Sequence, residues 1–144
     1  ILYGIKFTKT VNDKSIVFIK KIKKNHVIDE GLTQKIDQLT EEYKQNLIFL
    51  EPTFTLQRMA KDLKYPSYLL TQYFKEKQNC RFSDYRNQLR IEYFINTFQK
   101  TDLTQYKLLF VIKKYGYTNL ASFKKAFLEV RKQEFRQFLL QKNS

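Results

Sequence analysis

The scarcity of helix-breaking residues limits this chain to few kinds of fold. Only three glycines and two prolines occur among its 144 residues. Beyond residue 26, apolar and polar residues rarely alternate as they would in a half-buried strand, and apolar residues instead recur at spacings of three and four. That spacing gathers them on one face of a helix, where they can be buried together. We therefore expect an all-α fold for most of the chain.

Apolar periodicity and capping residues predict where the helices lie. A leading helix is expected within residues 29–50, where four residues share one helix face: Leu32, Ile36, Leu39 and Tyr43. Thr55 is suited to cap a second helix, because its hydroxyl can accept from unpaired backbone amides. After a break at residues 64–66, a third helix should cover residues 67–77, with Asn79 as a left-handed stop.

A longer fourth helix should cover residues 82–99 and end at the interruption of Thr101-Asp102. Gly116 then ends a fifth helix, Asn119 caps a sixth, and a closing helix contains Phe135 and Phe138. We assign the aromatic stripes to the core and not to a surface that stacks on a ligand. The expected core residues are Leu56, Ala60, Leu70, Phe74, Leu89, Phe123 and Phe127.

Residues 1–28 form a basic segment that is interpreted either as an N-terminal extension or as the remnant of an upstream domain. Ile5 and Phe7 alternate with polar residues, which fits a hairpin or the frayed end of a missing domain. The lysine-rich run over residues 20–24 is interpreted as a solvated linker, with a DNA-facing arm as the alternative. The chain starts at Ile1 and not at a methionine, which leaves open a sensor or membrane portion upstream.

The chain carries a large excess of positive charge. Its 27 Lys and Arg stand against 14 Asp and Glu, a formal net charge of +13, and residues 51–144 hold +10 of that excess. A compact region with this surplus favours a polyanionic partner, most commonly nucleic acid. Many small proteins are basic without binding a polyanion, so the charge alone leaves that alternative open.

Cysteine and histidine usage argues against disulfide and metal chemistry. The single cysteine, Cys80, excludes an internal disulfide and fits a reducing compartment, and the single histidine, His26, is interpreted as a surface residue. No apolar run reaches the length of a membrane span, and no signal peptide is visible. We expect a cytoplasmic protein without metal or cofactor; the alternative is a membrane-anchored parent protein that begins upstream of Ile1.

Two segments repeat one plan of short helix, three-residue break and second helix. They are residues 55–77, with the break at 64–66, and residues 108–130, with the break at 116–118. A helix-turn-helix presents one helix to the major groove of DNA. One such pattern is a weak signal, but two of them, joined by a long helix in a region of high positive charge, favour DNA binding.

Five short motifs within residues 50–139 match one known family in residue type and spacing. They are Leu56-x-x-Met59-Ala60; Leu70-x-x-x-Phe74-Lys75-Glu76; Phe82-x-x-Tyr85 followed by Leu89-Arg90-Ile91; Gly116-Tyr117; and Ser122-Phe123-x-x-Ala126-Phe127. On these motifs the region resembles the DNA-binding domain of AraC-type transcription regulators. The chain departs from the family pattern at five positions: Lys64 and Lys132 replace glycine, and Pro66, Ile112 and Phe135 replace serine, alanine and proline.

The resemblance implies a DNA-binding domain over residues 51–144, with two homeodomain-like helix-turn-helix subdomains joined by a long linker helix. One recognition helix of each subdomain would read base edges in successive major grooves. The base-reading positions are Tyr68, Thr71 and Gln72 in the first helix and Leu120, Ala121, Lys124 and Lys125 in the second. Phosphate contacts are expected from Lys75, Arg86, Arg90 and Ser122, and the alternative for Arg90 is a structural ion pair.

The resemblance also implies the partners. Double-stranded DNA is the first, and a bacterial, cytoplasmic transcription regulator of the activator type would have RNA polymerase as the second. A homodimer formed through the N-terminal segment or through a domain missing from this chain is left open. No small-molecule site is visible in the sequence.

Three other classes of function were weighed against DNA reading. We expect no enzyme, because the sequence has no nucleophile elbow, phosphate-binding glycine loop, His-Cys cluster or paired catalytic carboxylates. A protein-interaction or non-specific DNA-binding module of a larger sensor is the main alternative, and it is distinguished by its response to duplex DNA and salt. An RNA reader is less favoured, because no RNA-binding aromatic motif is present.

Overall fold

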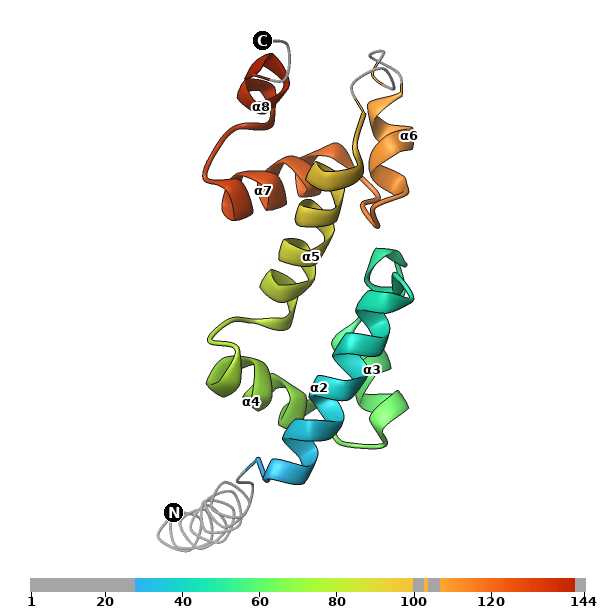
Figure 1. Cartoon of the computed structure of the whole chain (residues 1–144), viewed down its shortest axis with the longest axis vertical. Helices are drawn as coiled ribbons and strands as arrows, with labels where there is room; N and C mark the ends of the chain where they lie inside the picture. The colour runs from blue at the N-terminus through green and yellow to red at the C-terminus, as the bar shows by residue number, and fades with distance from the viewer. Residues whose placement is uncertain (1–27, 100–102, 104–106, 142–144) are drawn as a thin grey trace, which may run out of the picture.

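The described residues of the chain are helical throughout. In the computed structural model, which describes residues 28–99, 103 and 107–141, seven α-helices and one 3-10 helix occur and no strand is found in these ranges (Figure 1). The elements are α2 (Glu30–Gln45), η1 (Ile48–Leu50), α3 (Leu56–Leu63), α4 (Ser67–Lys77), α5 (Phe82–Thr97), α6 (Leu108–Lys113), α7 (Leu120–Arg131) and α8 (Phe135–Gln141). The expected all-α class is confirmed for this part of the chain. The interpretations of residues 1–26, of His26 and of Thr101-Asp102 lie outside it.

Side-chain caps set the start of three helices. The Asp29 carboxylate accepts from the Leu32 amide at 2.6 Å and starts α2. The Thr55 hydroxyl accepts from the Arg58 amide at 3.2 Å, and the Asn119 side chain accepts from the Ser122 amide at 2.8 Å. Each bond satisfies a backbone donor that has no partner inside its own helix. The predicted caps Thr55 and Asn119 are confirmed.

Left-handed residues set the end of several helices. Asn79 has φ 50° and follows α4, as predicted. Lys64, with φ 59°, ends α3, and Lys132, with φ 54°, ends α7. A left-handed conformation costs an ordinary L-residue about 1–2 kcal/mol. The chain therefore accepts this strain at Lys64 and Lys132, two positions where glycine would adopt the same conformation without it.

Two helices end earlier than expected. The leading segment 29–50 is not a single helix, because α2 ends at Gln45 and the left-handed Leu47 (φ 56°) then turns the chain into η1. The fourth helix ends at Thr97 and not at residue 99, because Phe98 is extended, with its amide still bonded to the Phe94 carbonyl at 2.8 Å.

Helices α2, α3 and α4 enclose the first core. Ile36, Met59, Leu70 and Phe74 are almost fully buried in it. Two tyrosine hydroxyls also join α2 to its neighbours: Tyr43 donates to Asp62 on α3, and Tyr73 on α4 donates to Asp37. Helix α2 is therefore held by both apolar packing and polar bonds. The described sequence 56–77 folds against it as a helix, a short break and a second helix.

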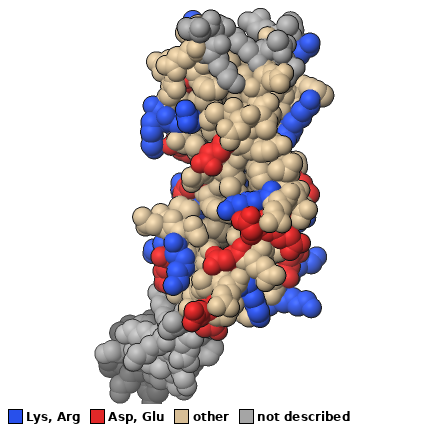
Figure 2. Space-filling view, viewed as in Figure 1, with Lys and Arg blue, Asp and Glu red and all other residues tan. Residues whose placement is uncertain are grey.

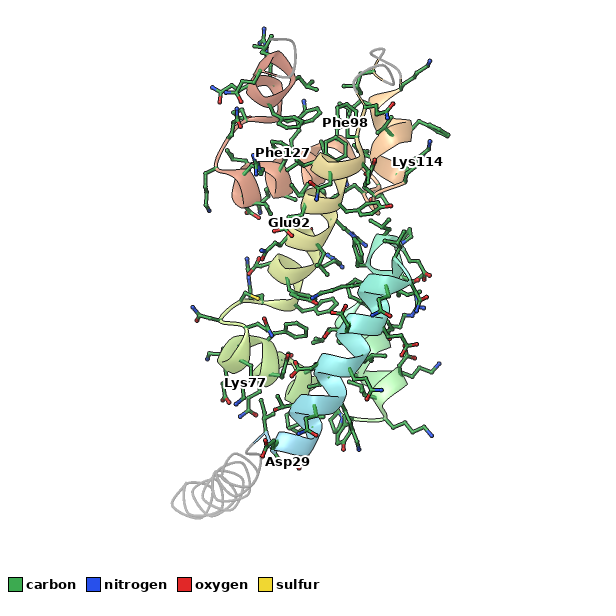
Figure 3. The ribbon with its side chains drawn as sticks, viewed as in Figure 1. Asp29, Lys77, Glu92, Phe98, Lys114 and Phe127 are labelled. Carbon is green, nitrogen blue, oxygen red and sulfur yellow. The ribbon has the colours of Figure 1, made fainter. Side chains whose placement is uncertain are left out.

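Aromatic rings dominate the second core, which lies between α5, α6, α7 and α8. Phe94 contacts the rings of Phe98, Tyr115, Phe123 and Phe135 at centroid distances of 4.6–5.9 Å. Most of these pairs are edge-to-face, an arrangement that favours aromatic contacts. Phe98 and Phe127, labelled in Figure 3, belong to the same core. The assignment of the aromatic stripes to the core is confirmed in this region.

Helix α5 connects the two cores, and Leu50 and Tyr93 pack against both. Five of the seven expected core residues are buried, whereas Leu56 and Leu89 are only half-buried. In Figure 1, α4 and α7 both project from the central α5 on the same side, and α2, α3 and α6 lie on the other. The two helices that carry most of the predicted site residues therefore share one side of the molecule.

Candidate nucleic-acid interface

The predicted residues of α4 lie on its accessible surface. Tyr68, Thr71 and Lys75 are exposed, and Gln72 is half-buried. The Thr71 hydroxyl donates to the Ser67 carbonyl at 3.2 Å, and the Gln72 amide donates to Glu76 at 2.9 Å. Both side chains are thus engaged within their own helix. To reach a base edge, Gln72 would exchange this exposed bond for one to DNA.

The predicted residues of α7 divide into two groups. Ala121, Ser122, Lys124 and Lys125 are exposed, whereas Leu120 is half-buried and packs against the second core. Lys125 lies 4.0 Å from Glu129, a contact too long and too exposed to hold the lysine firmly. This helix therefore presents mainly small residues and lysines, which suit phosphate contacts better than directed hydrogen bonds to bases.

A polar pocket of about 430 Å³ lies between α5 and α7. We call it the inter-lobe pocket. Its lining combines the N-terminal half of α5, the turn before α7 and the exposed face of α7; the residues used below are Arg81, Arg86, Arg90, Tyr117, Ser122 and Lys125. Three of the four expected phosphate contacts, namely Arg86, Arg90 and Ser122, thus come together in it, although they are up to 36 positions apart in the sequence.

Arg90 is a structural residue, and this corrects its assignment as a phosphate contact. It is 4% exposed, and its guanidinium donates to the carbonyls of Phe49 at 2.7 Å, Glu51 at 2.8 Å and Gly116 at 2.9 Å. The alternative of an ion pair is also wrong in detail, because the acceptors are backbone carbonyls and not a carboxylate. Arg90 joins the segment around η1 to the turn between α6 and α7.

Arg86 is the neighbouring cation, one helical turn earlier. Its Nη1 donates to the Phe54 carbonyl at 3.2 Å, and its Nε is buried without a hydrogen-bond partner in the described part of the chain. A buried donor without an acceptor is costly unless a ligand or water supplies one. Arg86 therefore remains a candidate anion contact.

A second groove connects this pocket with α4. Its volume is about 610 Å³, and it is lined by Thr71 and Lys75 of α4 together with residues of the α4–α5 junction. The inter-lobe pocket and this groove share Arg81, Ser83 and Asp84. The two hollows therefore adjoin at the start of α5, and we call them together the concave strip between α4 and α7.

Arg81 lines both hollows and was not among the residues predicted from the sequence. Its guanidinium donates to both carboxylate oxygens of Asp84 at 2.9 Å, and its backbone amide donates to the same group at 3.2 Å. These bonds lower the pKa of Asp84, through the side-chain bond from Arg81 first. The signal in the sequence was an acidic residue three positions after a basic one, at the start of an expected helix.

Charge is distributed unevenly over the view in Figure 2. Lys and Arg lie near the outer ends of α4 and α7 and also along the opposite edge of the molecule, whereas acidic side chains are concentrated over the region of α2 and α3 (Figure 2). Helix α2 carries four acidic residues against two lysines, and α7 carries three basic residues against one acidic residue. Helix α7 is thus better suited to a polyanion than α2.

Two other features are absent from the described residues. No group of three or more His, Cys, Asp or Glu side chains is arranged there to hold a metal ion. None of the described helices combines the length and the apolar character needed to cross a membrane.

Comparison with known proteins supports the fold alone. The chain matches no family model and no curated protein. It is similar to the solved structure of a protein of unknown function from Listeria innocua, with 22% sequence identity and a TM-score of 0.58, over 72% of this chain and 93% of that one. The helical arrangement therefore also occurs in a protein with a distant sequence.

Proposed function

We propose that this chain is a sequence-specific double-stranded DNA-binding protein of the transcription-regulator class. In this proposal α3–α4 and α6–α7 are two helix-turn-helix units, α5 is their linker, and α4 and α7 enter successive major grooves. The AraC-type motifs of the sequence motivate the assignment to that class, and RNA polymerase is the expected second partner.

The observation that carries the proposal is the concave strip between α4 and α7. It combines exposed predicted residues on two helices that project to one side with basic side chains from α5 between them. A DNA-binding surface needs basic groups for phosphates and helices for the grooves. Both are present on the same side of this molecule.

A protein-interaction or non-specific DNA-binding module remains the second candidate function. It is favoured by α7, where half-buried Leu120 and exposed Ala121 offer no directed hydrogen bonds to bases. Exposed apolar residues on α6, above all Phe110 at 65% exposure, also offer a surface to another protein. Such a module would bind all duplex sequences alike, or none.

Salt dependence of duplex binding tests the proposal. If about six Lys and Arg meet phosphates, log K should fall with log salt at a slope of about −4 to −7, from roughly −0.9 per phosphate. The double variant Lys124→Gln/Lys125→Gln should make the slope shallower by about two. The matched control Lys35→Gln/Lys44→Gln removes the same charge from α2 and should leave the slope unchanged. A flat salt response, or equal effects of both double variants, would contradict DNA binding through α7.

A further inference from the structure

The inter-lobe pocket holds positive charge that no carboxylate of the described chain neutralises. Its charged lining residues are the basic Arg81, Arg86, Arg90 and Lys125 and the acidic Asp84 and Glu129. Asp84 is bound to Arg81 at 2.9 Å, and Glu129 lies beside Lys125 at 4.0 Å. Four basic side chains thus stand against two acidic ones in the lining, and no ion pair of Arg86 or Arg90 occurs among the described residues.

Arg90 keeps its charge although it is buried. Burial first, and then the nearby Arg86, lower the pKa of Arg90 to about 10, so the guanidinium is still protonated at neutral pH. Its three carbonyl acceptors and the Tyr117 ring, 5.5 Å from Cζ, are neutral. Two neighbouring cations in a partly enclosed space repel each other, and an anion between α5 and α7 would relieve that repulsion.

The other donors of the lining suit an oxyanion. The exposed Ser122 lies in the first turn of α7, where the helix dipole favours negative charge. Thr118 adds a second hydroxyl and Lys125 a mobile ammonium group. A guanidinium, hydroxyls and an ammonium group around one space are the groups that bind phosphate oxygens in proteins. The backbone amide of Ser122 is already bonded to Asn119, so these side chains must supply the contacts.

We propose that the inter-lobe pocket binds one phosphate group, and that in the DNA complex this is the backbone phosphate midway between the two half-sites. The assignment of this phosphate to the DNA backbone rests on the proposed function. If the half-site centres are 10–10.5 base pairs apart, the phosphate lies about five base pairs from each centre. It would fix the position of α5 on the duplex without reading its sequence.

The test replaces single phosphates of a selected duplex, one at a time, by neutral methylphosphonates. Loss of a charge-assisted hydrogen bond corresponds to about a tenfold loss of affinity. We expect this loss in the wild-type chain for the midway phosphate, in addition to any losses inside the half-sites.

Two variants assign that loss to the pocket. Arg86→Gln removes the cation, but it also removes the bond to the Phe54 carbonyl and can weaken the fold. Ser122→Asp avoids this problem, because an acid in the first turn of a helix stabilises it while repelling a phosphate. Ser122→Asp should bind the unmodified duplex about tenfold more weakly, and the midway methylphosphonate should then have no further effect. The matched control Gln57→Glu adds the same charge in the first turn of α3, at an exposed residue outside the pocket, and should retain the wild-type pattern.

A second arm separates backbone phosphate from free phosphate. Inorganic phosphate is titrated into the chain without DNA while the amide resonances of Gly116 and Ser122 are followed. Saturation below about 1 mM, lost in Ser122→Asp, would support the phosphate site with a small molecule as its source. Only small changes of these amide resonances, together with the loss of affinity for the duplex with the midway methylphosphonate, would support the DNA backbone as the source of the phosphate. If duplex binding is bipartite and salt-dependent, but Ser122→Asp and Gln57→Glu behave alike in both arms, the pocket proposal is overturned and DNA binding stands. If no duplex is bound, the proposed function fails and the phosphate arm alone decides on the pocket.

Discussion

Gly116 and Arg90 meet where the turn before α7 reaches α5. Gly116 has φ 84°, and a Cβ built on it would lie 2.6 Å from Arg90 Cζ and 2.7 Å from the Leu50 carbonyl oxygen. The position therefore requires glycine for two independent reasons, backbone conformation and space. Its own carbonyl accepts from Arg90, so the turn and the guanidinium hold each other in place.

Gly116→Ala should be strongly destabilising. We expect it to lower the free energy of unfolding by about 2–4 kcal/mol, because it adds left-handed strain and displaces Arg90 from buried acceptors. Gly31→Ala is the matched control, since Gly31 lies in the first turn of α2 and its nearest neighbour is an Asp29 carboxylate oxygen at 3.5 Å. That change should be neutral or stabilising by up to about 1 kcal/mol. Urea unfolding of both variants checks this, and similar losses in the two would contradict the packing described for Arg90.

Tyr73 should make stability fall in alkali. Burial, then the hydrogen bond to Asp37, raises the pKa of Tyr73 to about 12 from an ordinary value of 10. Because the folded-state pKa is the higher one, this stabilisation is complete below pH 10 and is lost as the pH rises through 12. Tyr73→Phe should be less stable than wild type by about 1 kcal/mol at pH 7, and the difference should shrink above pH 10. Urea unfolding between pH 7 and 11.5 measures it; a pH-independent difference would show that Tyr73 does not titrate in this way.

The role of Arg90 could not be predicted from the sequence. Arg86 and Arg90 are spaced by four and look like one exposed basic stripe on a helix. The acceptors of Arg90 are 26, 39 and 41 positions away, so only the tertiary structure brings them together. Arg81 was missed for the opposite reason: its bonds to Asp84 are local, but its contribution to two hollows depends on where α4 and α7 lie.

At the scale of elements, local rules determined most helix boundaries. The caps at Thr55 and Asn119 and the limits of α4 were predicted correctly, because they depend on residues within one turn. The end of α2 was not, because Leu47 adopts a left-handed conformation that its residue type disfavours. The turn that follows places the Phe49 and Glu51 carbonyls at Arg90, so a distant side chain stabilises this boundary.

Helices α4 and α7 should contribute differently to DNA recognition. Gln72 can form directed bonds with a base, so Gln72→Ala should relax base preference in one half-site and cost about 1–3 kcal/mol at the matched base. Lys125→Ala should weaken binding to many sequences evenly and make the salt slope shallower by about one. Selection from randomised duplexes, followed by salt titration, measures both effects.

A matched control for Gln72→Ala exists on α5. Gln88 is exposed and donates to Glu92 at 3.0 Å, the same i to i+4 arrangement as Gln72 with Glu76 at 2.9 Å. Gln88→Ala therefore removes an equivalent amide and should leave the selected sequence unchanged. If Gln72→Ala also leaves it unchanged while Lys125→Ala rewrites it, the roles of α4 and α7 are reversed.

At the scale of the whole molecule, the two helix pairs are fixed relative to each other. Helix α5 has 16 residues, a length of about 24 Å at 1.5 Å per residue. Leu50 and Tyr93 pack against both cores, and Arg90 bonds to segments before and after α5. The sequence predicted the succession of helices, but the side on which α4 and α7 lie depends on these long-range contacts.

This rigidity predicts a strict spacing between half-sites. Successive major grooves on one face of the duplex are about 34–36 Å apart, or 10–10.5 base pairs. We expect one chain to cover an asymmetric, bipartite site with this spacing. Five inserted base pairs should turn the second half-site away from α7, and ten should restore its direction but place it out of reach. Either insertion should therefore lower the affinity to that of a single half-site, about 100-fold below the intact site, since each lost base contact costs about 1–3 kcal/mol.

Binding titrations of the spacer series, with the mass of each complex measured, check both spacing and stoichiometry. Tolerance of the ten-base-pair insertion by one bound chain would mean that the helix pairs move independently, and two bound chains per intact site would assign one half-site to each chain.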